Sequence, residues 1–312
     1  MSEIHLSLRQ YLEIEKIALG AFAPIEGPMT GDEFHSVVER MRLPDGSVFP
    51  LPVVLDVDEE VARAVRGRPS AALVFEGVQV GAIEPSDDYS CDRRACVERI
   101  FGTADEAHAG VAHFLRMKPR FLGGPVHLTR RVQFDFSEYE LTPAETRAHF
   151  RQRAWSTVAG FQTRNVPHRA HEHLQRLALT LTDGLFIQPL VGRKKRGDYE
   201  PAAILAGYRA LLQDFLPSER ILLGVLSTYM RYAGPREAVF HALIRRNYGC
   251  THFVVGRDHA GVGGYYREYE AQELAKGLSA ELGIQILDFP GPYLCRRCGG
   301  TVTERCAQSA GH

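Results

Sequence analysis

The 312-residue chain has few cysteines, almost no net charge and no long hydrophobic run. Six cysteines are too few to stabilise a chain of this length by disulfide bonds, which excludes a disulfide-rich secreted domain. A formal net charge of −1 excludes a general basic field for nucleic acid or an anionic membrane, so any anion site must be local. No stretch approaches the ~18 apolar residues of a membrane span, and no secretory signal pattern opens the chain. We therefore expect a cytoplasmic protein that binds neither nucleic acid nor membrane.

The residues that are present predict about two globular domains, because 45% of them are hydrophobic, as in ordinary soluble proteins. The pattern changes near residue 140. Before it, β-leaning runs such as 47–57 and 70–83 lie between glycine, proline and aspartate, with hairpin-like spacing and few helical segments. This pattern predicts an α+β or barrel-like domain over residues 1–140.

After residue 140, apolar strand-like runs alternate with amphipathic helical segments. We expect strands at 157–161, 184–190, 220–226, 251–255 and 284–289, and helices at 170–181, 201–215, 235–247 and 269–282. Such alternation predicts a parallel sheet covered by helices, over residues 141–290. Ligands of such sheets bind in the loops beyond the carboxyl ends of the strands, where helix N-termini offer unpaired N–H groups.

The segment FQTRNVPHRAHEHL, residues 161–174, gathers polar donors at the end of the first expected strand. They are Gln162, Arg164, Asn165, His168 and His171. His168 and His171 are three residues apart and therefore share one face at the start of a helix. Arg164 has a planar fork that suits a tetrahedral oxyanion. The pattern favours an anion site, and the alternative is a histidine pair that only caps or solvates the helix.

Two further segments follow strands in the same way. The loop GRDHAGVG, 256–263, follows one expected strand, and MRYAGPRE, 230–237, opens a helix after another. Alone, each is a weak motif, because neither matches a Walker loop or a dinucleotide fingerprint. His241 and His252 are single histidines in apolar segments, and we interpret them as core or surface residues.

Together and in this order, the segments QTRNVPHRAH, MRYAGPRE and GRDHAG resemble the ATP sulfurylase family. The N-terminal stretches LEIEKIALGAFAPIEGPM and FGTADEAHAGV resemble that family as well, so the likeness covers nearly the whole chain. Pro28 stands where the family usually has Phe, Ala109 where it has Pro, and Gln188 where it has His. None of these departures removes a donor from the three segments.

The resemblance implies a PUA-like N-terminal domain followed by a Rossmann-like nucleotidylyltransferase domain of the H-x-G-H type, with Ala170 in the glycine position. It also implies a reversible sulfate adenylyltransferase reaction, in which MgATP and sulfate give adenylyl sulfate (APS) and pyrophosphate. Mg²⁺ accompanies ATP, and the expected partner is a second copy of the chain in a homodimer.

The resemblance also assigns roles to residues. Sulfate would be held by Gln162, Arg164 and the backbone N–H of Ala260. ATP would be lined by Gln162, Thr163, Arg164, Asn165, Gly256, Arg257, Asp258 and His259. The catalytic set would be Thr163, Arg164 and Asn165, with His168 and His171 stabilising the phosphates in the transition state. Sulfate is already a full anion and needs no general base, so catalysis would come from positioning and charge stabilisation.

Cysteines cluster at the C-terminus, where Cys295-x-x-Cys298 predicts a tight turn that presents two thiolates to one ion. Cys306 and His312 would complete a tetrahedral structural zinc site, in a short zinc-knuckle-like segment over residues 291–312. Some members of the family carry a comparable Cys-Cys-Cys-His site. The alternative is a frayed tail of free thiols.

Three further alternatives remain open. The basic run Arg193 to Arg196 is either a solvated turn or, as the family suggests, a basic lid near the phosphates. The chain is alternatively a degenerate, non-catalytic sulfurylase-like protein that binds RNA or a partner. Within enzymes, the rival is adenylyl transfer to another acceptor. Near-neutral charge and intact loops oppose the non-catalytic hypothesis, while Arg164 and GRDHAG favour sulfate as the acceptor.

Overall fold

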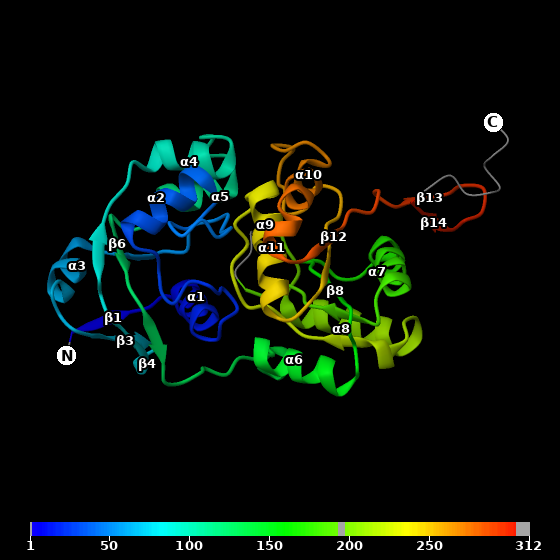
Figure 1. Ribbon diagram of the computed structural model, residues 1–312, viewed down its shortest axis with the longest axis horizontal. Coiled ribbons are helices and arrows are strands. Elements are labelled where there is room, and N and C mark those ends of the chain that lie inside the picture. Colours follow the sequence, from blue (N-terminus) through cyan, green and yellow to red (C-terminus); the bar gives the residue numbers. More distant parts are fainter. Residues whose placement is uncertain (1, 193–196, 304–312) are drawn as a thin grey trace.

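The computed structural model describes residues 2–192 and 197–303, drawn in colour in Figure 1. Its N-terminal part contains two small sheets. One has the order β1-β3-β4-β7, formed by Glu3–His5, Ala71–Phe75, Val78–Ile83 and Val126–Leu128. The other has the order β2-β6-β5, formed by Leu55–Val57, Arg120–Gly123 and Asp87–Tyr89. The predicted hairpin at 70–83 is therefore confirmed as β3 and β4, which pair antiparallel.

The N-terminal part is more helical than its sequence predicted. Its helices are α1 (Leu8–Ala18), α2 (Gly31–Arg40), α3 (Glu59–Val65), α4 (Arg93–Phe101) and α5 (Ala109–Leu115). The apolar run 47–57 forms a strand only at its end, in β2. Pro50 and Pro52 lack the N–H that a strand ladder needs, so this run packs into the core as irregular backbone instead.

A short connection of η1 (Ser137–Tyr139) and α6 (Pro143–Gln152) leads to the predicted parallel sheet. Its strand order is β10-β9-β8-β11-β12, and every neighbouring pair is parallel. The strands are Ile221–Leu223, Gly184–Ile187, Val158–Phe161, His252–Val254 and Gln285–Leu287 in that order. The chain first adds strands on one side of β8 and then returns to add β11 on its other side. The β8–β11 boundary is therefore the topological switch point, where ligands of such sheets bind.

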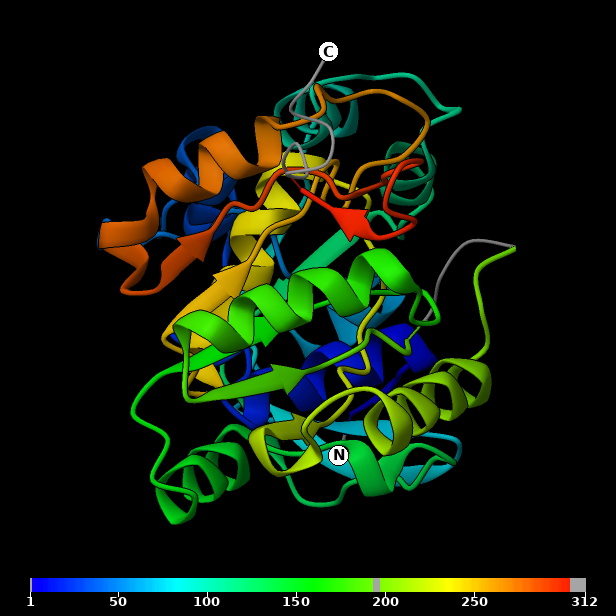
Figure 2. The ribbon, with the colours of Figure 1, turned by 90° about the vertical axis from the view of Figure 1, so that its right-hand side faces the viewer.

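The predicted helices of this half are confirmed as α7 (Arg169–Leu181), α8 (Pro201–Asp214) and α9 (Gly234–Asn247). The helix expected at 269–282 is divided at Leu278 into α10 (Glu270–Gly277) and α11 (Ser279–Leu282). Gly277, the last residue of α10, favours this break because glycine is a poor helix former. A terminal hairpin of β13 (Tyr293–Leu294) and β14 (Thr301–Val302) lies beside α7 (Figures 1 and 2).

Helix α9 joins the two halves, and Figure 1 shows it between the N-terminal helices and the parallel sheet. Phe240 on α9 packs against Phe22 and Phe49, with ring centroids 5.0 and 5.6 Å apart. Asn247 at its end donates to the carbonyls of Ala21 and Ala23. One continuous hydrophobic core therefore runs from the N-terminal sheets to β11.

No helix within residues 2–192 and 197–303 combines the length and the apolar character needed to cross a membrane.

Candidate active site

A cavity of about 320 Å³ opens at the switch point between β8 and β11. It is walled by the loop after β8, the start of α7, the loop after β11, and the segment before β13. The structure brings all the predicted substrate-loop residues to this cavity: Gln162, Thr163, Arg164, Asn165, His168, His171, Gly256, Arg257, Asp258, His259 and Ala260. Asp258 is the only carboxylate among its described lining residues, so the cavity is suited to anions.

The loop after β8 is fixed by its threonine. Thr163 is buried, its Oγ1 accepts the N–H of Asn165 at 3.1 Å, and its carbonyl accepts the N–H of Leu190 at 2.8 Å. Arg164 lies over the ring of Tyr232, with 5.4 Å from Cζ to the centroid. Its Nη2 donates to the carbonyl of Gly261 at a long 3.5 Å. The guanidinium is therefore oriented mainly by stacking, which leaves donors for a ligand.

The two predicted histidines lie at the start of α7. Their rings are stacked, with centroids 3.8 Å apart and 23° between planes, and Nδ1 of His171 is buried without a described hydrogen-bond partner. Burial, reinforced by His168, lowers the pKa of His171 to about 3, and burial also lowers the pKa of His168. The N-cap residue His168 makes no side-chain hydrogen bond to the first N–H groups of α7. Its N-terminus therefore offers unpaired donors and a positive dipole end to an anion.

The loop after β11 has a strained backbone. Asp258 and Ala260 have φ of 48° and 59°, a region that non-glycine residues rarely adopt. Such strain persists only where surrounding contacts hold it. Asp258 donates its N–H to Glu268 at 2.8 Å, and the carbonyl of Ala260 accepts the N–H of Gly234 at 3.2 Å. A Cβ on Gly261 would lie 1.8 Å from Oδ1 of Asp258, so any larger residue there would displace the Asp258 side chain.

His259, in the same loop, contacts a histidine that the sequence assigned to the core or surface. Nδ1 of His241 lies 3.0 Å from Nε2 of His259, and both residues are buried. Burial, with the positive charges of Arg245 and Arg164, lowers the pKa of His259 to about 3. Burial holds the pKa of His241 well below its usual value. His241 is thus a core residue that also orients His259, a role that no local pattern revealed.

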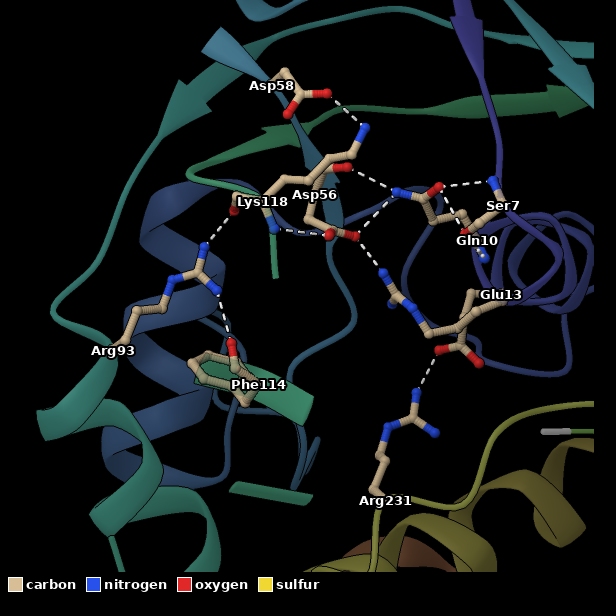
Figure 3. A network of polar contacts seen from close by, with 10 residues as sticks. Ser7, Gln10, Glu13, Asp56, Asp58, Arg93, Phe114, Lys118 and Arg231 are labelled. Carbon is tan, nitrogen blue, oxygen red and sulfur yellow. Dashed lines mark hydrogen bonds and ion pairs between the residues drawn. The ribbon is translucent and has the colours of Figure 1, made fainter. Parts of the chain in front are cut away.

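The segment MRYAGPRE lies behind the cavity rather than in it. Arg231 does not line the cavity; it forms a buried ion pair with Glu13 of α1, as Figure 3 shows. Its guanidinium stacks on Tyr229, 4.2 Å from Cζ to the ring centroid. Glu237 accepts the N–H groups of Arg231 and Ala233 at 2.9 and 3.0 Å. This segment therefore braces the site against the N-terminal half.

Pro28, Ala109 and Gln188, the three departures from the family pattern, lie outside the cavity lining. Gln188 is fully buried and donates from Nε2 to the carbonyl of Val225 at 3.3 Å. The backbone carbonyl of Gln188 accepts from Nη2 of Arg245 at 2.9 Å, and its side-chain Oε1 is buried without a described partner. The substitution at this position therefore acts on the packing beneath the site.

The predicted zinc ligands are described only in part. Cys295 and Cys298 lie at the turn of the β13–β14 hairpin, where Gly300 donates its N–H to Sγ of Cys298 at 3.4 Å. Cys306, His312 and the basic run 193–196 lie outside the described residues. Over 2–192 and 197–303, no group of three or more His, Cys, Asp or Glu side chains is arranged to hold a metal. The described part of the expected zinc knuckle is a plain two-stranded hairpin, so the zinc ion is not supported by it.

The neutral buried histidines predict a loss of stability in mild acid. An unfolded histidine binds its proton near pH 6.5, whereas His171 and His259 do so only near 3 when folded. The unfolded state therefore takes up more protons, and the free energy of unfolding falls as pH drops from about 6.5 towards 3. At pH 5 each histidine should account for a loss of about 2 kcal/mol. Urea unfolding at pH 7, 6 and 5 measures this loss, and equal stability at all three would contradict it.

The comparisons with known proteins agree with this geometry. The ATP-sulfurylase family model matches residues 137–312, and a PUA-like domain model matches residues 1–131. The sulfate adenylyltransferase of Hyperthermus butylicus is 44% identical over 302 residues, which are 97% of this chain and 77% of that protein. The sulfate adenylyltransferase of Symbiobacterium thermophilum is 46% identical over 307 residues, 98% of this chain and 78% of that protein.

A solved structure shares the fold. The hexameric APS kinase from Thiobacillus denitrificans superposes with a TM-score of 0.73 at 22% identity, over 97% of this chain and 54% of that one. At this identity the likeness concerns the fold alone. The family models and the relatives together cover nearly the whole chain. They show that this chain belongs to the ATP-sulfurylase family and carries a PUA-like domain before its parallel-sheet domain.

Proposed function

We propose that the chain is a sulfate adenylyltransferase, which joins the adenylyl group of MgATP to sulfate and also runs the reverse reaction. The observation that carries the proposal is the cavity at the switch point, where Arg164, two neutral histidines and a helix N-terminus converge. The names of the relatives at 44% and 46% identity support the same reaction.

The chemistry requires little more than placement. A sulfate oxygen bonds to the α-phosphorus of ATP, and the bond from that phosphorus to the bridging oxygen of the β-phosphate breaks, which releases pyrophosphate. No proton has to move, which suits a cavity whose only described carboxylate is Asp258. The barrier falls because two mutually repelling anions are held in line and the developing charge meets fixed donors.

We propose the residue roles that the family resemblance implies, and their gathering at one cavity supports them. Gln162, Arg164 and the N–H of Ala260 hold sulfate, since the two loops meet where Arg164 reaches Gly261. His168, His171 and the start of α7 face the phosphates. Thr163 fixes the loop, and Asn165 and the segment from Gly256 to His259 line ATP. Mg²⁺ arrives with ATP as part of the substrate.

The direct test is pyrophosphate release from ATP, measured with sulfate, with molybdate and without acceptor. Release that depends on either oxyanion is expected. Release only with a phosphorylated cofactor as acceptor would instead support adenylyl transfer to a different acceptor. No release with any acceptor would support the non-catalytic hypothesis, with RNA or a partner chain as ligand.

We also propose domain boundaries near residues 140 and 290, with residues 291–312 as a separate segment. The strands of the two small sheets end at Leu128, and the parallel strands lie between Val158 and Leu287, which supports this division. A cytoplasmic homodimer is proposed on the family resemblance, and light scattering of the purified protein measures its mass.

The zinc proposal makes a prediction of its own. The proposal rests on the family resemblance and on the Cys295-x-x-Cys298 spacing, which places both cysteines at the turn between β13 and β14. With Cys306 and His312 as further ligands, the purified protein should hold about one equivalent of zinc. Cys298→Ser should lose the metal and lower the melting temperature, whereas the control Cys91→Ser should keep both. Metal analysis that finds no zinc in protein purified without chelator would end the proposal.

A further inference from the structure

Two neighbouring tyrosines follow the glycine-rich loop, and their hydroxyl groups have different partners. The hydroxyl of Tyr265 donates to Oδ2 of Asp105 at 2.6 Å, at the exposed surface. The hydroxyl of Tyr266 lies deeper and donates to the backbone carbonyl of Tyr232 at 3.2 Å. Only the second bond reaches the segment that lies behind the anion cavity.

A buried histidine of the N-terminal half stands behind Tyr266. His108 has no exposed surface, and its Nδ1 accepts the N–H groups of Gly110 and Val111 at 3.1 and 3.3 Å as the N-cap of α5. Burial lowers the pKa of His108, which favours the neutral ring. Because Nδ1 accepts two hydrogen bonds, the single ring proton of the neutral form is on Nε2. Nε2 lies 3.2 Å from the Tyr266 hydroxyl and donates to it. A chain of bonds thus runs from His108 through Tyr266 to the Tyr232 carbonyl, and His108 also contacts the Tyr232 backbone directly.

The end of this chain is a strained residue. Tyr232 has φ of 60°, a left-handed conformation that a bulky residue adopts only when its surroundings impose it. The bond to its carbonyl is one contact that holds this backbone in place. The ring of Tyr232 in turn carries the Arg164 guanidinium, 5.4 Å from Cζ to the centroid.

Tyr266 also contacts the backbone of Gly234, two residues after Tyr232. A Cβ on Gly234 would lie 2.5 Å from the Tyr266 ring, so the two are in close contact. The N–H of Gly234 donates to the carbonyl of Ala260 at 3.2 Å. Segment 232–234 therefore touches two of the three residues assigned to sulfate, through the Arg164 side chain and the Ala260 carbonyl. Tyr266 contacts that segment through its hydroxyl and its ring.

We propose that Tyr266 is a positioning residue for the acceptor anion, which fixes segment 232–234 and thereby Arg164 and Ala260, and that His108 acts through Tyr266. Neither Tyr266 nor His108 lines the cavity, so both act through the placement of other groups. The inference rests on the proposed sulfate adenylyltransferase function and adds a link from the N-terminal half to the acceptor site.

The pair Tyr266→Phe and Tyr265→Phe tests the proposal, because each variant removes one hydroxyl and keeps its ring. Loss of the Tyr266 hydroxyl removes one donor from the carbonyl of a strained residue, which should raise the KM for sulfate about tenfold. The KM for ATP should stay within about twofold, because His168, His171 and the start of α7 are unchanged and Tyr266 does not line the cavity. Tyr265→Phe should change neither constant. Both constants come from pyrophosphate release in wild type and variants.

His108→Asn gives a second, independent test. Asparagine is a good N-cap and preserves α5, but it is too short to keep the bond to Tyr266. We expect a smaller rise in the KM for sulfate, about threefold. In the double variant with Tyr266→Phe the rise should be clearly less than the product of the two single rises, because both variants remove the same bond between His108 and Tyr266. If Tyr266→Phe lowers the melting temperature strongly, the KM for sulfate of His108→Asn decides the question instead.

The outcomes separate the inference from the proposed function. An unchanged KM for sulfate in Tyr266→Phe, an equal rise in both constants, an equal effect in Tyr265→Phe, or additive effects in the double variant would each overturn the inference. A wild-type protein without sulfate-dependent release would overturn the proposed function, and the inference with it. These cases are distinguished because the wild type is measured first.

Discussion

Arg164→Lys should reduce sulfate-dependent pyrophosphate release at least a hundredfold and should leave ATP binding largely intact. The guanidinium lies over the ring of Tyr232, reaches across to Gly261 and lines the cavity, so two contacts fix its direction. Lysine keeps the charge but loses the stacking plane and the second donor to a tetrahedral oxyanion. Loss of one preorganised donor typically costs ~10²–10³ in rate.

The measurement is the KM for sulfate, the kcat and the Kd for ATP in wild type and variant, together with ATP formation from APS and pyrophosphate. Both directions should fall together, because they share one transition state. Arg176→Lys is the matched control, since Arg176 pairs with Glu172 on the exposed side of α7. An unchanged KM for sulfate with a collapse of ATP affinity would make Arg164 a general phosphate contact instead.

The parallel-sheet half of the fold was predictable because its signals are local. Its short buried strands are continuous apolar runs, and its helices repeat apolar residues with helical spacing, so strand and helix existence could be predicted within a few residues. The N-terminal half was less predictable. Several of its strands contain only three residues, as β1, β2 and β5 do, and such lengths carry almost no pattern. There, the apolar run 47–57 indicated burial correctly, but only its last three residues form a strand.

The cavity was predictable for a related reason. Loops at the carboxyl ends of neighbouring parallel strands must meet, so the donors after β8 and β11 were expected to face one site, and they do. The contacts that brace the site were not predictable, because their partners are distant in sequence. Glu13 and Arg231 are 218 positions apart, and His108 and Tyr266 are 158 apart. Only the fold brings such pairs together.

His171→Ala should lower kcat about a hundredfold or more with little change in melting temperature at pH 7. His171 lies in the first turn of α7 and lines the cavity, and its buried Nδ1 has no described partner. A donor held beside the phosphates matters most when negative charge builds up on them, so its removal should affect the transition state more than ATP binding. The apolar residues of α7 that face the sheet, Leu174 and Ala178, remain in place.

His173→Ala is the matched control, because it removes the same residue type from the same helix at a position that does not line the cavity. We expect its kcat to match that of the wild type. The pKa of about 3 for His171 adds a second readout, since removing this histidine removes its proton uptake on unfolding. At pH 5, His171→Ala should therefore lose about 2 kcal/mol less stability than the wild type does relative to pH 7. A variant that unfolds at pH 7, or one that keeps its kcat, would show that His171 serves the core and not the reaction.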